Sequence, residues 1–392
     1  MKLQQLICIL SFLLIGACKN ANPPKQDAFN IELHPKKKEY HIGETLQIKV
    51  VNPKFEGKIV KISYQFHHQE LVVTNENIVL ENLMLGKQPL EVTVYTDKGE
   101  VYKVRKEILL LAGQAPKLYT YKILNEYPHD KQAYTQGLEF IGDTLVESTG
   151  QYRESSIRKW NPFTGEMYKN VPLQAMYFGE GATVFRDKII QLTWRENIGF
   201  VYDTQLKLLK TFSYNKSKEG WGLCHNGSDK LYKSDGSEKI WILNPNTFEE
   251  VDSLQLCTNK SIFTNANELE FVDGKIYANT YLKDGIMIIN PNNGAIEGVV
   301  DVRGLKEKVE QSSNKMDTYK EYITKIIIKE IQNMELEKVL DYTNIVVKLN
   351  KKTSQNDNIS IKIPLKTKVD DMTEIEINIK NTYKVYQNIN AR

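Results

Sequence analysis

The sequence predicts an all-β protein, in which an immunoglobulin-like β-sandwich is followed by a β-propeller. Two observations carry this prediction. Between residues 28 and 111, apolar and polar residues alternate in short runs that Gly, Pro, Asn and Asp separate, as in strands that bury one face. Further along, one pattern occurs four times at intervals of 44, 41 and 46 residues. This interval matches the roughly 40–50 residues of a propeller blade.

Residues 1–18 have the features of an export signal. Lys2 precedes an apolar run that is too short to span a membrane, and small residues lead to Cys18. The segment Leu14-Ile-Gly-Ala-Cys18 resembles the bacterial lipobox, which implies cleavage before Cys18 and lipidation of its thiol. The alternative is an uncleaved signal with an incidental cysteine. Residues 19–27 then form a polar tether. With Lys19 in second position, this resemblance implies a lipid-anchored protein of the bacterial cell envelope, on the outer membrane and facing the periplasm.

Residues 28–113 contain the alternating runs of the predicted sandwich. They include FNIELH, TLQIKVV, IVKISYQF, LEVTVYT and VYKVRKEILLL, which are short strands of the kind that immunoglobulin-like folds use. His67 and His68 are predicted to lie in one of these strands, and we interpret them as packed or solvated histidines. We predict that this domain is a spacer or docking module without chemistry of its own.

Residues 114–306 contain the repeats of the predicted propeller. The first strand of each blade lines the central channel, so equivalent positions of successive blades reach the same height around it. The leading positions of the four repeats are Gln136, Glu180, Trp221 and Asn267. We therefore expect these four side chains to converge at one mouth of the channel.

The four leading positions hold two amides, one carboxylate and one indole. A purely structural repeat would tend to keep one residue type there, whereas a carboxylate among amides and aromatic rings suits a small polar ligand. The pattern alone leaves a hydrated polar channel open as the alternative.

Eight short segments in unbroken order resemble the glutaminyl-peptide cyclotransferases of plants and bacteria over residues 119–306. They are Asp130…Ala133-Tyr-Thr-Gln-Gly-Leu, Glu147-Ser-Thr-Gly, Phe178-Gly-Glu-Gly, Gln191-Leu-Thr-Trp, Gly199-Phe-Val-Tyr, Glu219-Gly-Trp-Gly-Leu, Ser234-Asp-Gly and Asn267-Glu-Leu-Glu with Tyr277-Ala-Asn279. The resemblance implies a five-bladed propeller that is unrelated to the zinc-dependent animal enzymes of the same activity.

The resemblance also implies an acyltransferase that converts the N-terminal glutamine of peptides or proteins into pyroglutamate and releases ammonia. In this reading Glu180 transfers the proton, and shielding from water raises its pKa. Gln136 and Asn267 bind the carboxamide and the developing oxyanion. The apolar walls that bind the glutamine side chain are formed by Tyr134, Trp194, Trp221 and Tyr281.

Cofactors and nucleic acid are not expected. The net charge of +3 on 392 residues and the absence of a basic stripe argue against nucleic acid. No Cys/His cluster has zinc spacing, and Cys224 and Cys257 are interpreted as buried free thiols. We predict no metal ligand, although the resemblance leaves a structural calcium ion in the channel open.

Residues 307–392 form a divergent tail rich in Lys, Ile and Asn. The family would continue with Leu-Asn-Gly-Ile and Thr-Gly-Lys-x-Trp, which complete the fifth blade and supply a lysine and a tryptophan to the channel. Here both are missing, so the last blade is expected to be atypical or incomplete. Residues 314–341 are compatible with a helix, and NIVVKLN, NISIKIPL and TEIEINIK alternate like strands.

Three explanations of the tail stay open: a replacement blade, an appended module that leaves the propeller open, or an out-of-frame gene end. The alternative to an enzyme is a non-catalytic or degenerate envelope propeller that binds peptides or protein partners.

Overall fold

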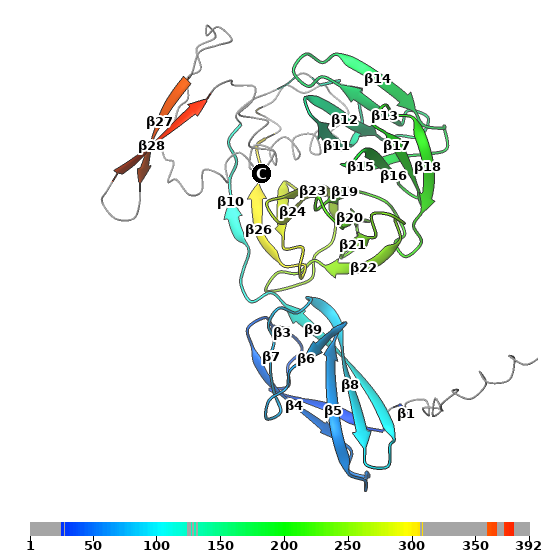
Figure 1. Cartoon of the computed structure of the whole chain (residues 1–392), viewed down its shortest axis with the longest axis vertical. Coiled ribbons are helices and arrows are strands. Elements are labelled where there is room, and N and C mark those ends of the chain that lie inside the picture. The colour runs from blue at the N-terminus through cyan, green and yellow to red at the C-terminus, as the bar shows by residue number, and fades with distance from the viewer. Residues whose placement is uncertain are drawn as a thin grey trace, which may run out of the picture. The chain divides into compact units, whose positions relative to one another are not determined.

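The computed structural model describes residues 28–305 apart from 124–126, 128 and 131, together with residue 308 and the strands at 25–26, 359–366 and 372–379. Every named element in this part of the chain is a β-strand, which confirms the prediction of an all-β protein (Figure 1). The chain divides into two compact units. The first comprises Met1–Leu83 and Lys87–Leu110, and the second comprises Met84–Gly86 and Leu111–Arg392.

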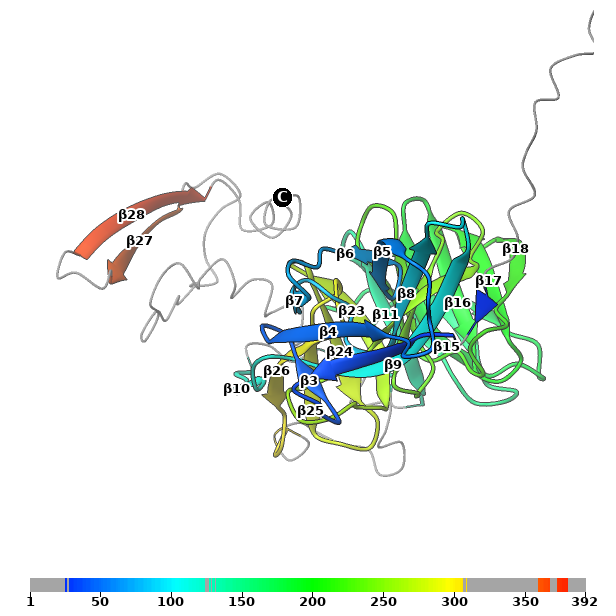
Figure 2. The same ribbon diagram turned by 90° about the horizontal axis from the view of Figure 1, so that it is seen from below.

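The first unit contains two sheets, whose strands are blue to cyan in both views (Figures 1 and 2). The larger sheet has the order β1 (Lys25–Gln26), β9 (Val101–Leu111), β8 (Gly86–Thr96), β5 (Ile59–Phe66) and β6 (Gln69–Leu71), and β3 (Tyr40–His41) also pairs with β9. The smaller sheet has the order β2 (Asn30–His34), β4 (Thr45–Val51) and β7 (Asn77–Val79). Alternate residues of β8 are buried along its whole length, because successive side chains of a strand point to opposite faces.

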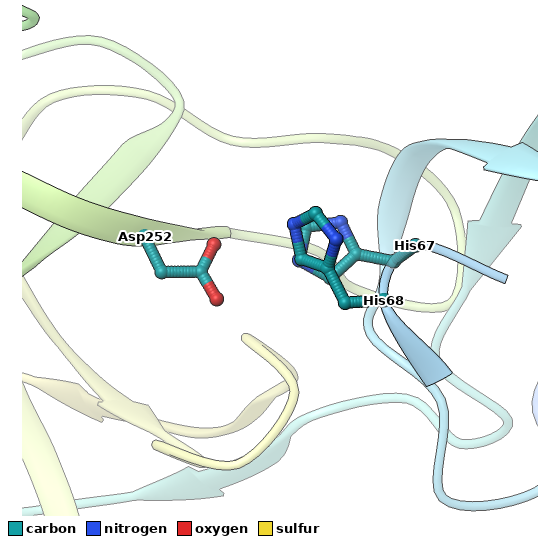
Figure 3. Close-up of side chains that lie close together, drawn as sticks. All are labelled: His67, His68 and Asp252. Atoms are coloured by element: carbon teal, nitrogen blue, oxygen red, sulfur yellow. The ribbon is translucent and has the colours of Figure 1, made fainter. Parts of the chain in front are cut away.

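The five alternating runs predicted in this region all form strands, namely β2, β4, β5, β8 and β9. The prediction that His67 and His68 lie in a strand is wrong, because these two residues form the turn between β5 and β6. Their imidazoles lie side by side with ring centroids 4.1 Å apart (Figure 3). His67 adopts a positive φ of 54°, and its backbone N–H donates to the Pro89 carbonyl.

The second unit contains four sheets that repeat one antiparallel arrangement, and they follow one another around the unit in green to yellow in Figure 1. The first is β11 (Thr135–Ile141), β12 (Thr144–Thr149), β13 (Ser156–Trp160) and β14 (Met167–Pro172), and the second is β15 (Gly179–Phe185), β16 (Lys188–Thr193), β17 (Ile198–Asp203) and β18 (Leu208–Ser213). The third is β19 (Leu223–His225), β20 (Leu231–Ser234), β21 (Lys239–Leu243) and β22 (Glu250–Gln255). The fourth is β23 (Ala266–Val272), β24 (Lys275–Thr280), β25 (Gly285–Ile289) and β26 (Ile296–Asp301), to which β10 (Lys117–Tyr119) adds in parallel.

Apolar side chains fill the space between successive sheets. One buried cluster joins the first and second sheets through Ile157, Ala182 and Ile189, and another joins the third and fourth sheets through Ile240 and Ile276. Such contacts between sheets remove both faces from water and hold the first strands close together. This arrangement is propeller-like. The predicted count of five blades stays a prediction, because the described residues supply four such sheets.

Met84–Gly86 belongs to the second unit although it interrupts the sequence of the first. The Leu85 N–H donates to the Asn293 carbonyl at 3.0 Å. Met84 packs against the apolar cluster of the third and fourth sheets. Gly86 has a φ of 93°, a left-handed value that suits glycine.

Two of the predicted tail strands are present. β27 (Ile359–Lys366) and β28 (Met372–Ile379) form an antiparallel pair, as the alternation of NISIKIPL and TEIEINIK indicated. The proposed helix at 314–341 and the strand NIVVKLN lie outside the described residues, as do the signal segment, Cys18 and most of the tether. Cys224 and Cys257 are buried free thiols, as predicted. Among the described residues, no helix has the length and apolar character needed to cross a bilayer.

Candidate active site

The three predicted catalytic residues occupy the first strands of three sheets. Gln136 lies in β11, Glu180 in β15 and Asn267 in β23, close to the start of each strand. Their exposed fractions are 8%, 6% and 6%. Burial this complete is uncommon for polar side chains on a structural strand, because each must be compensated by polar partners.

Glycines after the leading positions bring these strands into backbone contact. A Cβ on Gly137 would lie 2.2 Å from the Ala182 nitrogen, and one on Gly181 would lie 2.3 Å from the Trp221 carbonyl oxygen. A Cβ on Gly222 would lie 2.1 Å from the Asn267 carbonyl oxygen. Only glycine permits such close approach.

These contacts place the leading positions of the four sheets beside one another. The Gly181 N–H also donates to the Trp221 carbonyl at 2.7 Å, so β15 is hydrogen-bonded to the start of the third sheet. Gln136, Glu180, Trp221 and Asn267 therefore lie at adjoining positions, as the repeat predicts. Glu180 thus has Gln136 at the neighbouring position on one side and Trp221 on the other. Asn267 lies at the position after Trp221.

An aromatic wall borders these polar residues on the side of the first two sheets. The Phe178 ring lies 6.1 Å from Tyr134, 5.4 Å from Trp194 and 5.4 Å from Tyr152, measured between centroids. Gly150 lies against both Phe178 and the Gln136 side chain, so this wall reaches the predicted site. Two predicted binding residues, Tyr134 and Trp194, thus meet through Phe178.

The Tyr152 phenol of this wall donates a hydrogen bond to Glu196 at 2.9 Å. Burial raises the pKa of Tyr152, and the hydrogen bond to Glu196 raises it further. The negative charge of Glu180 acts in the same direction, while Arg195 opposes it.

The other two predicted binding residues meet on the side of the third and fourth sheets. The rings of Trp221 and Tyr281 pack edge to face with centroids 5.4 Å apart. Gly236 lies directly against the benzene portion of Trp221, where a Cβ would be 2.5 Å from the ring. This glycine, in the turn after β20, leaves room for the indole.

The carboxylate of Glu219 links this Trp221–Tyr281 pair to the rings around Phe178, and the two groups of rings together form the aromatic wall. Its Oε2 accepts hydrogen bonds from the indole N–H of Trp194 at 2.6 Å and of Trp221 at 2.8 Å. Its Oε1 accepts from Nε of Arg195 at 3.1 Å. Burial alone would raise the pKa of Glu219, but the hydrogen bonds from Trp221, Trp194 and Arg195 outweigh burial and lower it.

A buried ion pair fixes the segment that carries Glu219. Lys233 is fully buried, and its Nζ lies 3.2 Å from Oε1 of Glu250. The same ammonium donates to the Glu219 carbonyl at 2.8 Å and to the Ser217 hydroxyl at 2.5 Å. Burial lowers the pKa of Lys233 against the opposing attraction of Glu250. For Glu250, burial raises the pKa, but the charge of Lys233 and the hydrogen bonds of Ser217 outweigh burial and lower it.

A second buried ionic cluster lies beside Gln136, in the first sheet. The Glu147 carboxylate accepts from the Thr135 hydroxyl at 2.6 Å and from Nε of Arg158 at 2.9 Å, and Nε2 of His129 lies 3.0 Å away. Arg158 also binds Asp130. Burial would raise the pKa of Glu147, but His129 and Arg158 outweigh burial and hold it below its ordinary value. His129 thus belongs to this ionic cluster.

Some residues of this region were not predicted as site residues. Glu219 and Phe178 lie within the sequence motifs, each two positions before a predicted residue. Comparison of the repeats identified only the positions at which the recurring pattern begins, so these two residues were missed. Tyr152 follows Gly150 in a turn, where no periodic signal identifies it. The lipidation site and the absence of cofactors stay predictions.

Fold and site together define a propeller-like protein with a buried polar cluster at the starts of its first strands and an aromatic wall beside it. The family model described as glutamine cyclotransferase matches residues 96–321, which is more than half of the chain, so the chain belongs to this family. The family resemblance stated from the sequence motifs is thereby confirmed.

Two relatives illustrate the similarity. The chain is 37% identical over 179 residues to a glutaminyl-peptide cyclotransferase of Arabidopsis thaliana. The aligned region covers 45% of this chain and 55% of the relative. The chain therefore spans about half the length of this curated relative. It is also similar to the crystal structure of the Myxococcus xanthus glutaminyl cyclase, with 31% identity and a TM-score of 0.47 over 51% of this chain and 84% of that one.

Proposed function

We propose that this protein is a glutaminyl-peptide cyclotransferase, which converts the N-terminal glutamine of peptides or proteins into pyroglutamate. The observation that carries the proposal is the placement of Gln136, Glu180, Trp221 and Asn267 at adjoining positions, beside an aromatic wall. Membership of the glutamine cyclotransferase family supports it.

The reaction is an intramolecular aminolysis. The α-amine nitrogen attacks the side-chain carboxamide carbon, a new C–N bond closes the five-membered lactam, and the original C–NH₂ bond breaks to release ammonia. One proton leaves the attacking amine and one proton reaches the departing nitrogen, so no water is consumed. The substrate already holds both reacting groups, and the protein gains most by fixing the folded pose.

Glu180 is proposed to move the proton. A carboxylate at this position can take a proton from the attacking amine and return it to the leaving ammonia. Gln136 and Asn267 carry side-chain N–H groups on two other first strands, which can donate to the oxyanion that develops on the carboxamide oxygen. The rings of Tyr134, Trp194, Trp221 and Tyr281 are proposed to hold the aliphatic part of the glutamine and exclude water.

The test is ammonia release, with the matching loss of mass, from a synthetic peptide that begins with glutamine. We expect Glu180→Gln to lower kcat by about 10²–10⁴-fold, the usual contribution of general acid–base catalysis. Glu166→Gln, the same chemical change at an exposed position just before β14, serves as the matched control and should keep full turnover. Full turnover in a folded Glu180→Gln protein would exclude the proton-transfer role, and no release from folded wild type would favour a binding protein.

We further propose that the first unit is an immunoglobulin-like domain at residues 28–113, and that residues 114–306 form a five-bladed propeller with an atypical last blade. Two sheets in the first unit and four repeated sheets in the second support this. An experimental structure of the full chain tests both points. A closed ring of four blades would contradict the five-bladed arrangement.

Lipid anchoring at Cys18 is proposed from the lipobox-like segment, with the bacterial outer membrane as the location. Growth with a labelled fatty acid should label the wild-type protein and leave Cys18→Ser unlabelled. Fractionation of the envelope then tests the location. Equal labelling of both proteins would rule out Cys18 as the anchor.

A further inference from the structure

Three hydrogen-bond donors converge on the carboxylate of Glu219. Both indole N–H groups donate to the same oxygen, Oε2, and they come from different sheets. Trp194 follows β16 of the second sheet, and Trp221 precedes β19 of the third. One oxygen atom therefore fixes the N–H edges of two indole rings that belong to different sheets and to separate segments of the sequence.

Arg195 contacts both Glu219 and Trp194. Its Nε donates to the other oxygen of Glu219, and its guanidinium lies over the Trp194 ring, 3.7 Å from the centroid. Trp194 is thus restrained at its N–H edge by Glu219 and on its face by a cation–π contact. Hydrogen bonds to an ionised carboxylate are about twice as strong as neutral ones, so the restraint is substantial.

The backbone of Glu219 is held by a buried ion pair. Its backbone carbonyl accepts from the fully buried Lys233, which is paired with Glu250. The next residue, Gly220, donates its N–H to the Trp194 carbonyl at 2.8 Å. The segment that carries this carboxylate is therefore hydrogen-bonded to the backbone of Trp194 as well.

We propose that Glu219 is a positioning residue, which fixes the angle and spacing of the Trp194 and Trp221 indoles and thereby the width of the wall that receives the glutamine side chain. This inference deepens the proposed function and rests on it. Substrate and transition state use the wall alike, so loss of Glu219 should raise KM more than it lowers kcat.

The kinetic test compares Glu219→Ala with Glu219→Gln. The alanine variant removes the shared acceptor, and we expect kcat/KM to fall by about 10–100-fold, as for lost hydrogen bonds to a charged group. A glutamine side chain keeps an oxygen that can accept from both indole N–H groups without carrying a charge, so Glu219→Gln should recover most of that loss. Equal damage in both variants would overturn the positioning role, because the charge rather than the acceptor would then matter.

A second readout needs no activity. The four tryptophans give four indole N–H signals in a nitrogen-15 NMR spectrum, which Trp194→Phe and Trp221→Phe assign. Glu219→Ala should shift both assigned signals in the substrate-free protein and leave the signal of Trp241, whose indole donates to Asp235, in place. Glu166→Gln should leave the signals of Trp194 and Trp221 in place.

The two readouts separate the possible failures. If both indole signals move but wild type releases no ammonia, Glu219 positions the wall and the proposed reaction is wrong. If ammonia is released and neither signal moves, the reaction stands and the role of Glu219 is refuted. Unfolding midpoints of each variant confirm that a loss of activity is not a loss of fold.

Discussion

Gly181 illustrates how single residues build the site. It follows Glu180, and its missing side chain lets β15 approach the Trp221 carbonyl. Its φ is not among the positive values, so the requirement is for space rather than for an unusual backbone conformation. The same residue that narrows the ring of first strands therefore sets how close Glu180 comes to the neighbouring sheet.

We predict that Gly181→Ala lowers the free energy of unfolding by about 1–3 kcal/mol, because the added methyl group meets backbone that cannot move aside. Urea unfolding measures this. Gly285→Ala is the matched control, since the nearest atom to its Cβ would be at an ordinary 3.5 Å. The control should change stability by less than about 0.5 kcal/mol. An equal effect at both positions would contradict the steric explanation.

Residues at recurring positions of the repeats could be predicted as site residues, whereas the residues that hydrogen-bond to them could not. Gln136, Glu180, Trp221 and Asn267 stand at a repeated position, so their placement on successive sheets could be predicted. Glu219 precedes Trp221 in only one repeat. Its partner Trp194 is 25 residues away, and only the folded structure shows that the two indoles share an acceptor.

The connection between β18 and β19 shows how a buried charge can organise an irregular element. Ser217 and Lys216 donate their backbone N–H groups to Glu250, and Lys233 binds the Glu219 carbonyl. These bonds satisfy backbone groups that a strand would otherwise pair. The connection is therefore held in one conformation, although it contains no regular secondary structure.

We predict that Lys233→Met alone destabilises the protein by about 3–5 kcal/mol, because it leaves the Glu250 charge buried without its partner. The double variant Lys233→Met with Glu250→Gln should lose less than the sum of the two single variants. Chemical denaturation of all four proteins gives the coupling energy. Strict additivity would show that the two side chains do not stabilise each other.

The elements themselves were largely predictable. Alternation identified five strands of the first unit and two of the tail, because apolar and polar residues alternate along a strand that buries only one face. β10 was not predicted. It is short, two of its three residues are exposed, and it pairs in parallel with β26, a partner about 180 residues away that no local pattern reveals.

At the scale of the whole molecule, carboxylates that the fold stabilises in their charged form determine the response to acid. Glu147, Glu219 and Glu250 have pKa values below their ordinary 4.5. A carboxyl whose pKa is lower in the folded state contributes stability above its unfolded pKa, and this contribution is lost as the pH falls through the folded pKa.

We therefore expect the free energy of unfolding to stay nearly constant from pH 7 to about pH 5 and to decrease below pH 4.5. Urea unfolding at a series of pH values tests this. A protein that became more stable below pH 4.5 would show that these carboxylates are not stabilised in their charged form.

The repeat interval predicted the propeller-like arrangement because each repeat is one sheet that cannot bury its own faces. The division into units was harder to anticipate. Nothing in the composition of Met84–Gly86 distinguishes it from its neighbours, and its membership of the second unit depends on partners some 170 to 210 residues further along the chain.

The position of Met84–Gly86 limits how recombination can separate the two units of this protein. Because Met84–Gly86 contributes a hydrogen bond and apolar packing to the second unit, a gene fragment starting at residue 111 would encode that unit without one of its parts. Recombination that exchanged the first unit for an unrelated domain would remove the same three residues. The two units are therefore expected to have been transmitted and to have diverged as a pair, with substitutions at Met84 matched by changes in the apolar cluster against which it packs.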